Sequence, residues 1–462
     1  MFQFEQQNSP LVQASSQSIE KEPIEKESLE QESLEKTSLD QNSHCDRLAP
    51  KPTTIEATGL SESLLLDLMV KHIFTAGVLT KEQMVAKIGV TGGILQQLLD
   101  IAKKLAWVEN RQSTASGQMR YALSNSGDIH AKLTFSRSGY LGLAPVPLKQ
   151  YVPICRQQSS RGNPITLDML KQGLKSLVLP DDLLLKIGPA MNSSRPVLIY
   201  GPPGTGKSFL CRHLNQVLGD DILIPYALAI GNDIIQVFDP ELHHTVEKSL
   251  NTNPLDLERG HDPRWIQCHR PLRITGGELT SEMLEIQFDS HSRNYMAPIQ
   301  LKANNGILLL DDLGRQRISA KQLFNRWIIP MEERRDFLSL QSGEHFEIPF
   351  ELILLFSTNL NPKELVDEAF LRRLGYKIHF DALEPKLYRK IWFQVCEDLS
   401  LSCSDEMFQY LLLELHKKHG KLLIPCYPRD LLGIMSDQIK FMKLAPVVTQ
   451  SLIDSAWSIY FV

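Results

Sequence analysis

The sequence lacks the features that mark secreted and membrane-spanning chains. Its seven cysteines lie at 45, 155, 211, 268, 396, 403 and 426 with no C-x-x-C pair, a scatter typical of reduced cytosolic thiols rather than of a disulfide framework. No apolar run approaches the roughly 20 residues that span a bilayer, and polar residues between Met1 and Ser18 interrupt any secretory signal. We therefore expect a cytoplasmic protein with no membrane partner and no structural disulfides.

The chain also lacks a basic surplus. Its formal net charge is −5, and residues 18–42, with eight acidic residues and three lysines, carry that same balance. The remainder is therefore nearly neutral, and no polybasic field argues for nucleic acid or anionic lipid as an obligatory partner.

Residues 18–42 repeat every five residues, from Ser18–Glu22 to Ser38–Asn42. A five-residue apolar period fits neither a helix nor a strand, so no continuous face can be buried. The pattern predicts a disordered acidic tail, which could be a spacer, a tether or an arm that binds proteins.

The most specific motif is a phosphate-binding loop. It consists of Gly201, Pro202, Pro203, Gly204, Thr205, Gly206, Lys207 and Ser208, a complete G-x-x-x-x-G-K-[ST] pattern. An apolar strand candidate (197–200) precedes it and a helix candidate (208–214) follows it, so backbone N–H groups at a helix N-terminus can face the phosphates of ATP. We expect Lys207 to reach the β- and γ-phosphates and Ser208 to offer its hydroxyl to Mg²⁺.

A second strand candidate ends in two acids. Residues 306–310 are Gly-Ile-Leu-Leu-Leu, followed by Asp311 and Asp312, a Walker B pattern. We expect Asp311 to hold the Mg²⁺ shell and Asp312 to orient and polarise the attacking water. A third candidate strand, 352–356, leads to Asn359, which either senses the γ-phosphate and positions the water or simply ends the strand in a turn.

Together these segments resemble the AAA+ ATPase superfamily over about residues 165–462. The resemblance is carried by three segments: 303–312, 331–334 and 356–359. Two further runs, 336–340 and 345–348, predict a hairpin before the third strand. A hairpin there resembles the pre-sensor-1 group, which includes MoxR-like, chaperone-like ATPases. The resemblance implies an α/β fold, with a P-loop AAA+ core on a parallel sheet and a C-terminal α-helical lid.

Arginines complete the resemblance. Residues 367–373 look like the helix that ends in arginine fingers, so Arg373, with Arg372 beside it, is expected to point at ATP bound to a neighbouring subunit. Arg429, near the start of a late helix, resembles a sensor-2 arginine that reaches the γ-phosphate from the lid. The plainer alternatives are a solvated helix end for the pair and an ion pair with Asp430 or another acid for Arg429.

One residue departs from the family pattern. The second Walker B acid is usually glutamate, whereas Asp312 is one methylene shorter. Because the position of a general base governs its efficiency, we expect slower hydrolysis rather than none.

Composition shifts divide the chain into five expected parts. They are an acidic tail (1–54), a winged-helix-like α+β domain (55–135), an irregular connector (136–164), the AAA+ core (165–383) and the lid (384–462). Three helix candidates and a hairpin suggest the winged helix. Its stretch 56–132 has eight basic and seven acidic residues, a balance that favours docking of a protein over DNA.

The segment between P-loop and Walker B is longer than a compact core needs. It covers 103 positions from Ser208 to Asp311, which predicts an insertion, with a loop at 251–263. Histidines and a cysteine in and around it match no closed zinc pattern, so ordinary surface roles are expected for all five: His243, His244, His261, Cys268 and His269.

The combined interpretation is an ATP hydrolase that uses ATP and Mg²⁺ at subunit interfaces to remodel or mature a protein client. Its expected partners are copies of itself in a ring, with a hexamer as one option, and an unidentified client. Two alternatives stay open: a DNA-associated motor or helicase loader anchored by the winged helix, and a nucleotide-dependent scaffold with negligible turnover.

Overall fold

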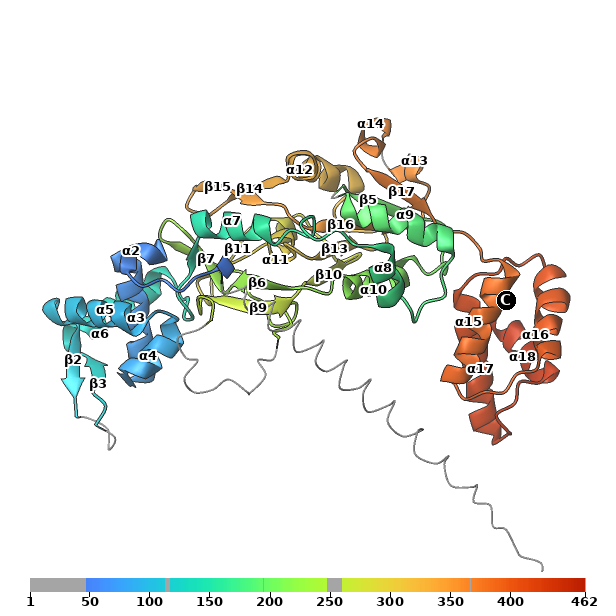
Figure 1. Cartoon of the computed structure of the whole chain (residues 1–462), viewed down its shortest axis with the longest axis horizontal. Helices are drawn as coiled ribbons and strands as arrows, with labels where there is room; N and C mark the ends of the chain where they lie inside the picture. Colours follow the sequence, from blue (N-terminus) through green and yellow to red (C-terminus); the bar gives the residue numbers. More distant parts are fainter. Residues whose placement is uncertain (1–46, 113–116, 194, 247–259, 366, 462) are drawn as a thin grey trace, which may run out of the picture.

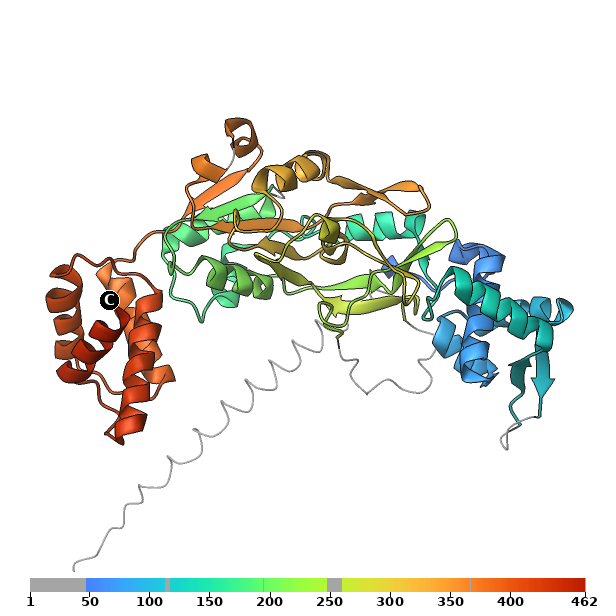
Figure 2. The ribbon, with the colours of Figure 1, turned by 180° about the vertical axis from the view of Figure 1, so that it is seen from behind.

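The computed structural model describes residues 47–112, 117–193, 195–246, 260–365 and 367–461. The acidic repeat and most of the expected loop at 251–263 lie outside these ranges. The molecule is elongated, with two β-sheets in the middle, a helical unit formed by the N-terminal segments at one end and the C-terminal helices at the other (Figure 1; Figure 2 shows the reverse side).

The central sheet is parallel and has five strands. Its spatial order is β10 (Leu272–Thr275), β13 (Ile307–Leu310), β16 (Ile353–Thr358), β5 (Val197–Tyr200) and β17 (Tyr376–His379). All side chains of β13 and β16 are buried, because their continuous apolar runs supply both faces of a sheet that helices cover on each side. This arrangement confirms the expected α/β fold with a parallel sheet.

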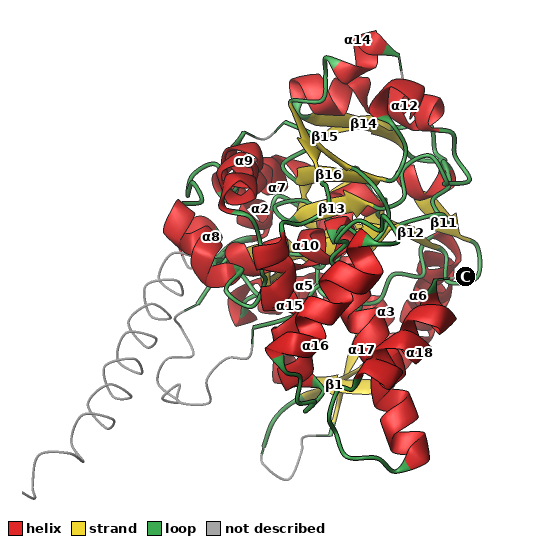
Figure 3. Ribbon diagram, turned by 90° about the vertical axis from the view of Figure 1, so that its right-hand side faces the viewer, coloured by secondary structure: helices red, strands yellow, loops and turns green. Residues whose placement is uncertain are grey.

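Alternate residues of these strands enter two different cores. Ile307 and Leu309 pack with helices α8 (Leu167–Gly173), α9 (Asp181–Asn192) and α10 (Lys207–His213). Leu308 and Leu310 pack on the opposite face with Trp327 of α12 (Ala320–Glu333). The sheet therefore forms the middle layer of a three-layer core, which Figure 3 shows from one end.

The insertion between P-loop and Walker B forms a second sheet. Its order is β11 (Gln287–Asp289), β12 (Asn294–Met296), β8 (Asp233–Gln236), β7 (Ala227–Ile230) and β4 (Val146–Pro147), and β6 (Asp221–Pro225) pairs separately with β9 (Trp265–His269). Strand β4 comes from the expected connector, which also contains helix α7 (Leu148–Gln157). The prediction of an irregular connector was therefore wrong, because Val146 and Tyr151 are apolar anchors of this sheet's core.

The N-terminal unit has the expected three helices and hairpin, with additional elements. It comprises α2 (Ile55–Thr58), α3 (Glu62–Ala76), β1 (Val78–Thr80), α4 (Lys81–Ile88), α5 (Gly92–Lys104), β2 (Val108–Arg111), β3 (Arg120–Leu123) and α6 (Asn125–Arg137). Its strands form an antiparallel sheet in the order β1-β3-β2. Whether the unit belongs to the winged-helix class stays a prediction.

This unit shares its core with the second sheet. Ala227, Ala229 and Ile234 pack into the same apolar cluster as the helices of the unit. Arg264, 1% exposed, pairs with Asp262 at 2.7 Å and donates to the carbonyl of Thr58 at 2.9 Å. Removing one partner of such a buried pair leaves an uncompensated charge, so Arg264 fixes the N-terminal unit to the core.

The C-terminal region is helical, as expected, and has a core of its own. It contains α15 (Pro385–Asp398), α16 (Asp405–Tyr410), the π-helix η4 (Leu411–Lys417), α17 (Cys426–Met442) and α18 (Gln450–Tyr460). Helix α17 begins at Cys426, so Arg429 lies within its first turn. No helix in the described part of the chain combines the length and apolar character that crossing a membrane requires.

A buried histidine makes the stability of this helical region depend on pH. His416 is 2% exposed and lies 3.1 Å from the hydroxyl of Tyr388, and burial lowers its pKa to about 4 from its ordinary value of 6.5. The unfolded chain therefore binds the extra proton below about pH 6.5, so folding stability is full above that pH and is lost progressively down to about pH 4. A shift of this size corresponds to about 3 kcal/mol.

We expect thermal unfolding followed by circular dichroism to show this loss between pH 6.5 and 4. In His416→Gln, which keeps a hydrogen-bonding side chain without a titrating imidazole, the dependence should be flatter. An equally steep decline in that variant would assign the pH dependence to other groups.

Candidate functional site

The phosphate-binding loop joins β5 to α10, as its motif requires. Gly204 and Gly206 adopt φ values of +80° and +87°, the left-handed region that only glycine enters at little cost. A Cβ on Gly201 would lie 2.0 Å from the carbonyl oxygen of Phe380. The glycines are therefore required by the backbone path that turns N–H groups toward the N-terminus of α10.

Lys207 lies inside this loop. Its Nζ donates to the carbonyl oxygens of Gly201 at 2.9 Å and Pro202 at 2.7 Å. Burial lowers the pKa of Lys207, and the nearby carboxylates of Asp311 and Asp312 oppose that shift. The ammonium group is thus held by neutral loop carbonyls, which it can exchange for stronger, charged phosphate acceptors.

The Walker B carboxylate and the loop hydroxyl meet directly. Ser208 donates through Oγ to Oδ1 of Asp311 at 2.7 Å, although the two residues are 103 positions apart. Hydroxyl and carboxylate oxygens are the hard ligands that Mg²⁺ prefers. This pair therefore fits a magnesium ion beside the phosphates.

Asp312 and Asn359 also come together. Nδ2 of Asn359 donates to Oδ1 of Asp312 at 3.1 Å, linking the ends of neighbouring strands β13 and β16. Asp312 adopts φ +51°, a left-handed conformation that aspartate and asparagine tolerate better than other non-glycine residues. The arrangement allows Asn359 to orient the carboxylate.

A glutamine that the sequence analysis missed holds this turn. Gln316 donates through Nε2 to the carbonyl oxygens of Asp311 at 2.8 Å and Asp312 at 3.1 Å, and its Oε1 accepts from the N–H of Gly314 at 2.8 Å. These bonds fix the backbone that places Asp312. No sequence pattern pointed to this role, because an amide side chain shortly after two acids is not a motif and the carbonyls it reaches are set by the fold.

The two candidate finger arginines lie away from this cluster, next to α12. Helix α14 (Glu368–Leu371) ends just before Arg372, which is exposed. Arg373 donates through Nε to Oε1 of Glu332 at 2.5 Å, at the C-terminal end of α12. Figure 1 shows α14 projecting from the core beyond α12.

The C-terminal helices also contact the loop. The N–H of Cys426 donates to the carbonyl of Gly204 at 3.2 Å, and the guanidinium carbon of Arg429 lies 5.4 Å from the ring centre of Phe209. Asp430 accepts instead from the hydroxyl of Tyr460 at 2.6 Å. Arg429 thus stacks on the residue that follows the P-loop serine, which keeps its charge near the loop.

The predicted hairpin forms, and it is packed rather than free-standing. Strands β14 (Arg335–Ser339) and β15 (His345–Pro349) pair in antiparallel register. Leu338 and Ile348 are buried in the core of the second sheet, and at the tip Ser342 donates to Asp233 at 3.2 Å. Any movement of the hairpin therefore has to involve the second sheet.

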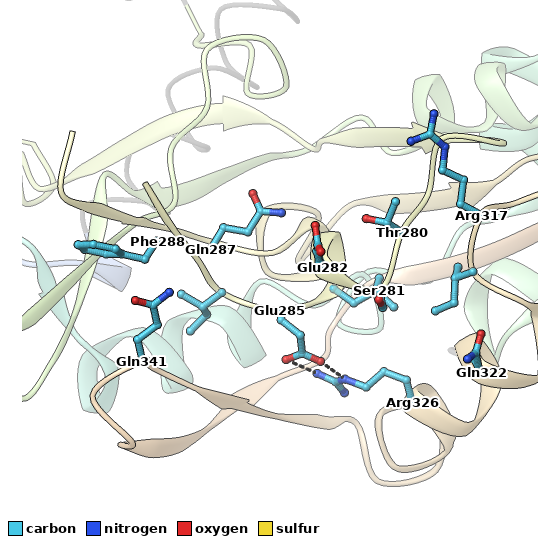
Figure 4. A pocket seen from close by; sticks show the side chains of 13 residues that line it. Thr280, Ser281, Glu282, Glu285, Gln287, Phe288, Arg317, Gln322, Arg326 and Gln341 are labelled. Carbon is cyan, nitrogen blue, oxygen red and sulfur yellow. Dashed lines mark hydrogen bonds and ion pairs between the residues drawn. The ribbon is translucent and has the colours of Figure 1, made fainter. Parts of the chain in front are cut away.

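A groove of about 890 Å³ runs beside the hairpin. It is lined by the 280–288 segment, by Arg317 and α12, and by Gln341 at the hairpin tip (Figure 4). Arg326 crosses its floor, 2.6 Å from both Glu285 and the fully buried Asp336. This arginine connects α12 to the first strand of the hairpin.

The histidines and cysteine in the insertion do not form a metal site. His243 bonds to the carbonyl of Lys302, His269 pairs with Asp221, and Cys268 is buried. Across the described ranges no group of three or more His, Cys, Asp or Glu side chains could hold a metal ion. The Ser208–Asp311 pair is a different kind of site, because phosphate oxygens and water would supply its other ligands.

A family described as a domain of unknown function (DUF8689) matches residues 384–459. No curated protein is significantly similar to the chain.

Solved structures with some likeness include RuvB of Thermotoga maritima, a Holliday junction branch migration motor. It is 12% identical, with 68% of this chain and 72% of that chain covered and a TM-score of 0.33. NtrX from Brucella abortus is 12% identical, with 61% and 57% covered and a TM-score of 0.37. At this level of similarity, the function has to be inferred from the chain's own residues.

Proposed function

We propose that the chain is an AAA+ ATPase that binds and hydrolyses ATP at subunit interfaces to remodel or mature a protein client. The observation that carries the proposal is the convergence of Lys207, the Ser208–Asp311 pair and the Asp312–Asn359 pair at the carboxyl ends of three neighbouring parallel strands. The chain connection from β5 runs to β10 on one side of it, whereas the connection from the neighbouring β16 runs to β17 on the other side. Ligands bind at such switch points in open α/β sheets.

The residues present fit ATP and Mg²⁺. A nucleoside triphosphate with its metal requires a glycine-rich loop, a lysine and a hydroxyl–carboxylate pair, and all three are present. The metal would neutralise phosphate charge when bound. Ser208 and Asp311 would hold it, while Lys207 would leave its loop carbonyls for phosphate oxygens.

Asp312 is the proposed general base. Asn359 donates a hydrogen bond to this carboxylate, and Gln316 bonds to the backbone of the turn that carries it. The carboxylate therefore has little freedom to rotate away from an attacking water. Positioned general bases contribute about 10²–10⁴ in rate. The rigidity of this turn thus offsets part of the loss of rate expected from a side chain one methylene shorter than glutamate.

Helix α12 connects this site to the β14–β15 hairpin and to Arg373. The turn after Asp312 leads into its N-terminus, Arg326 in its middle ties it to Asp336 of the hairpin, and Glu332 at its end holds Arg373. A shift of the Walker B turn on hydrolysis would therefore reach both the hairpin and the finger. The groove beside the hairpin is where we place contact with the client.

The lid would close over ATP through Arg429, whose guanidinium already lies over Phe209. Arg373 would serve a neighbouring subunit, and this completion in trans requires a ring or at least a dimer. A finger supplied in trans contributes about 10³–10⁵ in rate.

A DNA-associated motor is the second candidate. Arg111 and Arg120, both exposed, are cross-strand partners on the β2–β3 hairpin and could reach phosphates. Glu109 lies 3.6 Å from Arg111, however, and reduces the local positive charge. The near-neutral charge of the N-terminal unit argues against DNA binding more strongly than these two arginines argue for it.

The proposal is tested by steady-state phosphate release measured against protein concentration. We expect the rate per chain to rise with concentration, because each site needs a neighbour, and we expect Lys207→Ala to abolish turnover. Tight ATP binding without turnover at any concentration would favour the scaffold alternative. Stimulation by duplex DNA that weakens with added salt would favour the DNA-associated motor.

A further inference from the structure

Two cysteines of the lid lie against each other. Trp392 and Cys396 are four residues apart on α15 and both are buried, so their side chains lie on one face of that helix. Cys403 follows the helix and returns to the same face, where its Sγ accepts a hydrogen bond from Nε1 of Trp392 at 3.4 Å. The Sγ of Cys403 also donates to the carbonyl oxygen of Ser404 at 3.5 Å, and Cys396 and Cys403 lie close enough for each thiol to shift the pKa of the other.

Backbone bonds hold this arrangement in place. The N–H of Leu401 donates to the carbonyl of Cys396 at 2.8 Å, which turns the chain back at the end of α15. Ser402 then donates to Pro446 at 2.9 Å and accepts from Val448 at 2.8 Å. The approach of the two thiols is therefore built into the fold.

The two thiols differ in exposure and in pKa, as the attacking and resolving thiols of a redox pair do. Cys403 is partly exposed, and the hydrogen bond from Cys396 lowers its pKa to about 7, with the Trp392 N–H acting in the same direction. Cys396 is 3% exposed, and its hydrogen bond to Cys403, together with burial, raises its pKa. Accessible thiolates beside a second cysteine are the usual sites of reversible oxidation.

We propose that Cys396 and Cys403 form a redox modification site at which a peroxide converts the thiol pair to a disulfide. The Cys403 thiolate attacks one peroxide oxygen, the O–O bond breaks, and the hydroxide that leaves takes up the proton that the thiol had lost, so that a sulfenic acid and one water result. The Cys396 sulfur then attacks the sulfenic sulfur, its proton leaves with the hydroxyl as a second water, and the S–S bond forms. Two thiols are oxidised, one hydrogen peroxide is reduced, and a cellular dithiol can reverse the change.

The test uses the full chain carrying Cys45→Ser, so that every remaining cysteine lies in the described part. After treatment with hydrogen peroxide, peptide mass spectrometry should show a cross-linked pair of peptides containing Cys396 and Cys403, lost on reduction. In Cys396→Ser the reaction should stop at a sulfenic acid on Cys403 that dimedone traps, and in Cys403→Ser no adduct should form at Cys396.

The fully buried Cys155 and Cys211 are matched internal controls, since burial raises the pKa of each thiol. They should stay reduced at peroxide concentrations that oxidise the lid pair. Oxidation of all cysteines at equal rates, or a Cys403 that stays a free thiol while others react, would overturn the proposal. The experiment needs no nucleotide, so its outcome is independent of the proposed ATPase function.

Discussion

Replacing Asp312 by asparagine should leave ATP binding intact and reduce turnover by at least about 100-fold, the contribution expected of a positioned general base. Asparagine has the same size, tolerates the φ of +51° found at this position, and can still bond to Asn359. It cannot accept a proton from water. Phosphate release gives the turnover, and titration with a fluorescent ATP analogue gives the affinity.

Asp312→Glu is the matched control. It keeps the carboxylate, but it places a longer side chain on a left-handed backbone, which is less favourable for glutamate than for aspartate. We expect this variant to lose far less activity than Asp312→Asn. If asparagine supported the wild-type rate, the base would have to be another group and the role given to Asp312 would be wrong.

The strands and loop of the site could be predicted because their signals are local. An apolar run, a glycine-rich loop and a helix former are consecutive around Lys207, and Asp311 directly follows its strand. The pairing of Ser208 with Asp311 follows once both strands share a parallel sheet, since their carboxyl ends meet at one edge.

Other features of the site depend on contacts between distant segments and left no local pattern. Gln316 matters because of the carbonyls it reaches, and Glu332 because α14 returns to the end of α12. A single sequence shows these residues only as a polar turn residue and a helix-end acid. Arg429 was placed near the P-loop by resemblance alone, and its stacking on Phe209 could not be anticipated.

The domain organisation was the least predictable part. The sequence indicated an insertion after the P-loop, but not that it forms a sheet completed by β4 of the connector. Strand β4 has only two residues, too few for any periodic signal. The consequence is mechanical: the N-terminal unit, the second sheet and the hairpin share packed cores, so they are expected to move together rather than as separate domains.

Arg373 gives the strongest test of assembly. Removing a finger that acts in trans should lower turnover by about 10³-fold or more while ATP affinity changes little. Arg373→Ala and Lys207→Ala should each be inactive alone, yet an equal mixture should regain activity. In a mixed ring about one interface in four combines an intact P-loop with an intact finger.

Glu332→Gln distinguishes this role from a structural one. It removes the ion pair between Glu332 and Arg373, in which Glu332 is about half-exposed, and exposed pairs contribute little to stability. If Arg373 works only as the partner of Glu332, both variants should lose activity equally and mixing should restore nothing. If Arg373 completes a neighbour's site, Glu332→Gln should keep its turnover, because the guanidinium remains available to the next subunit.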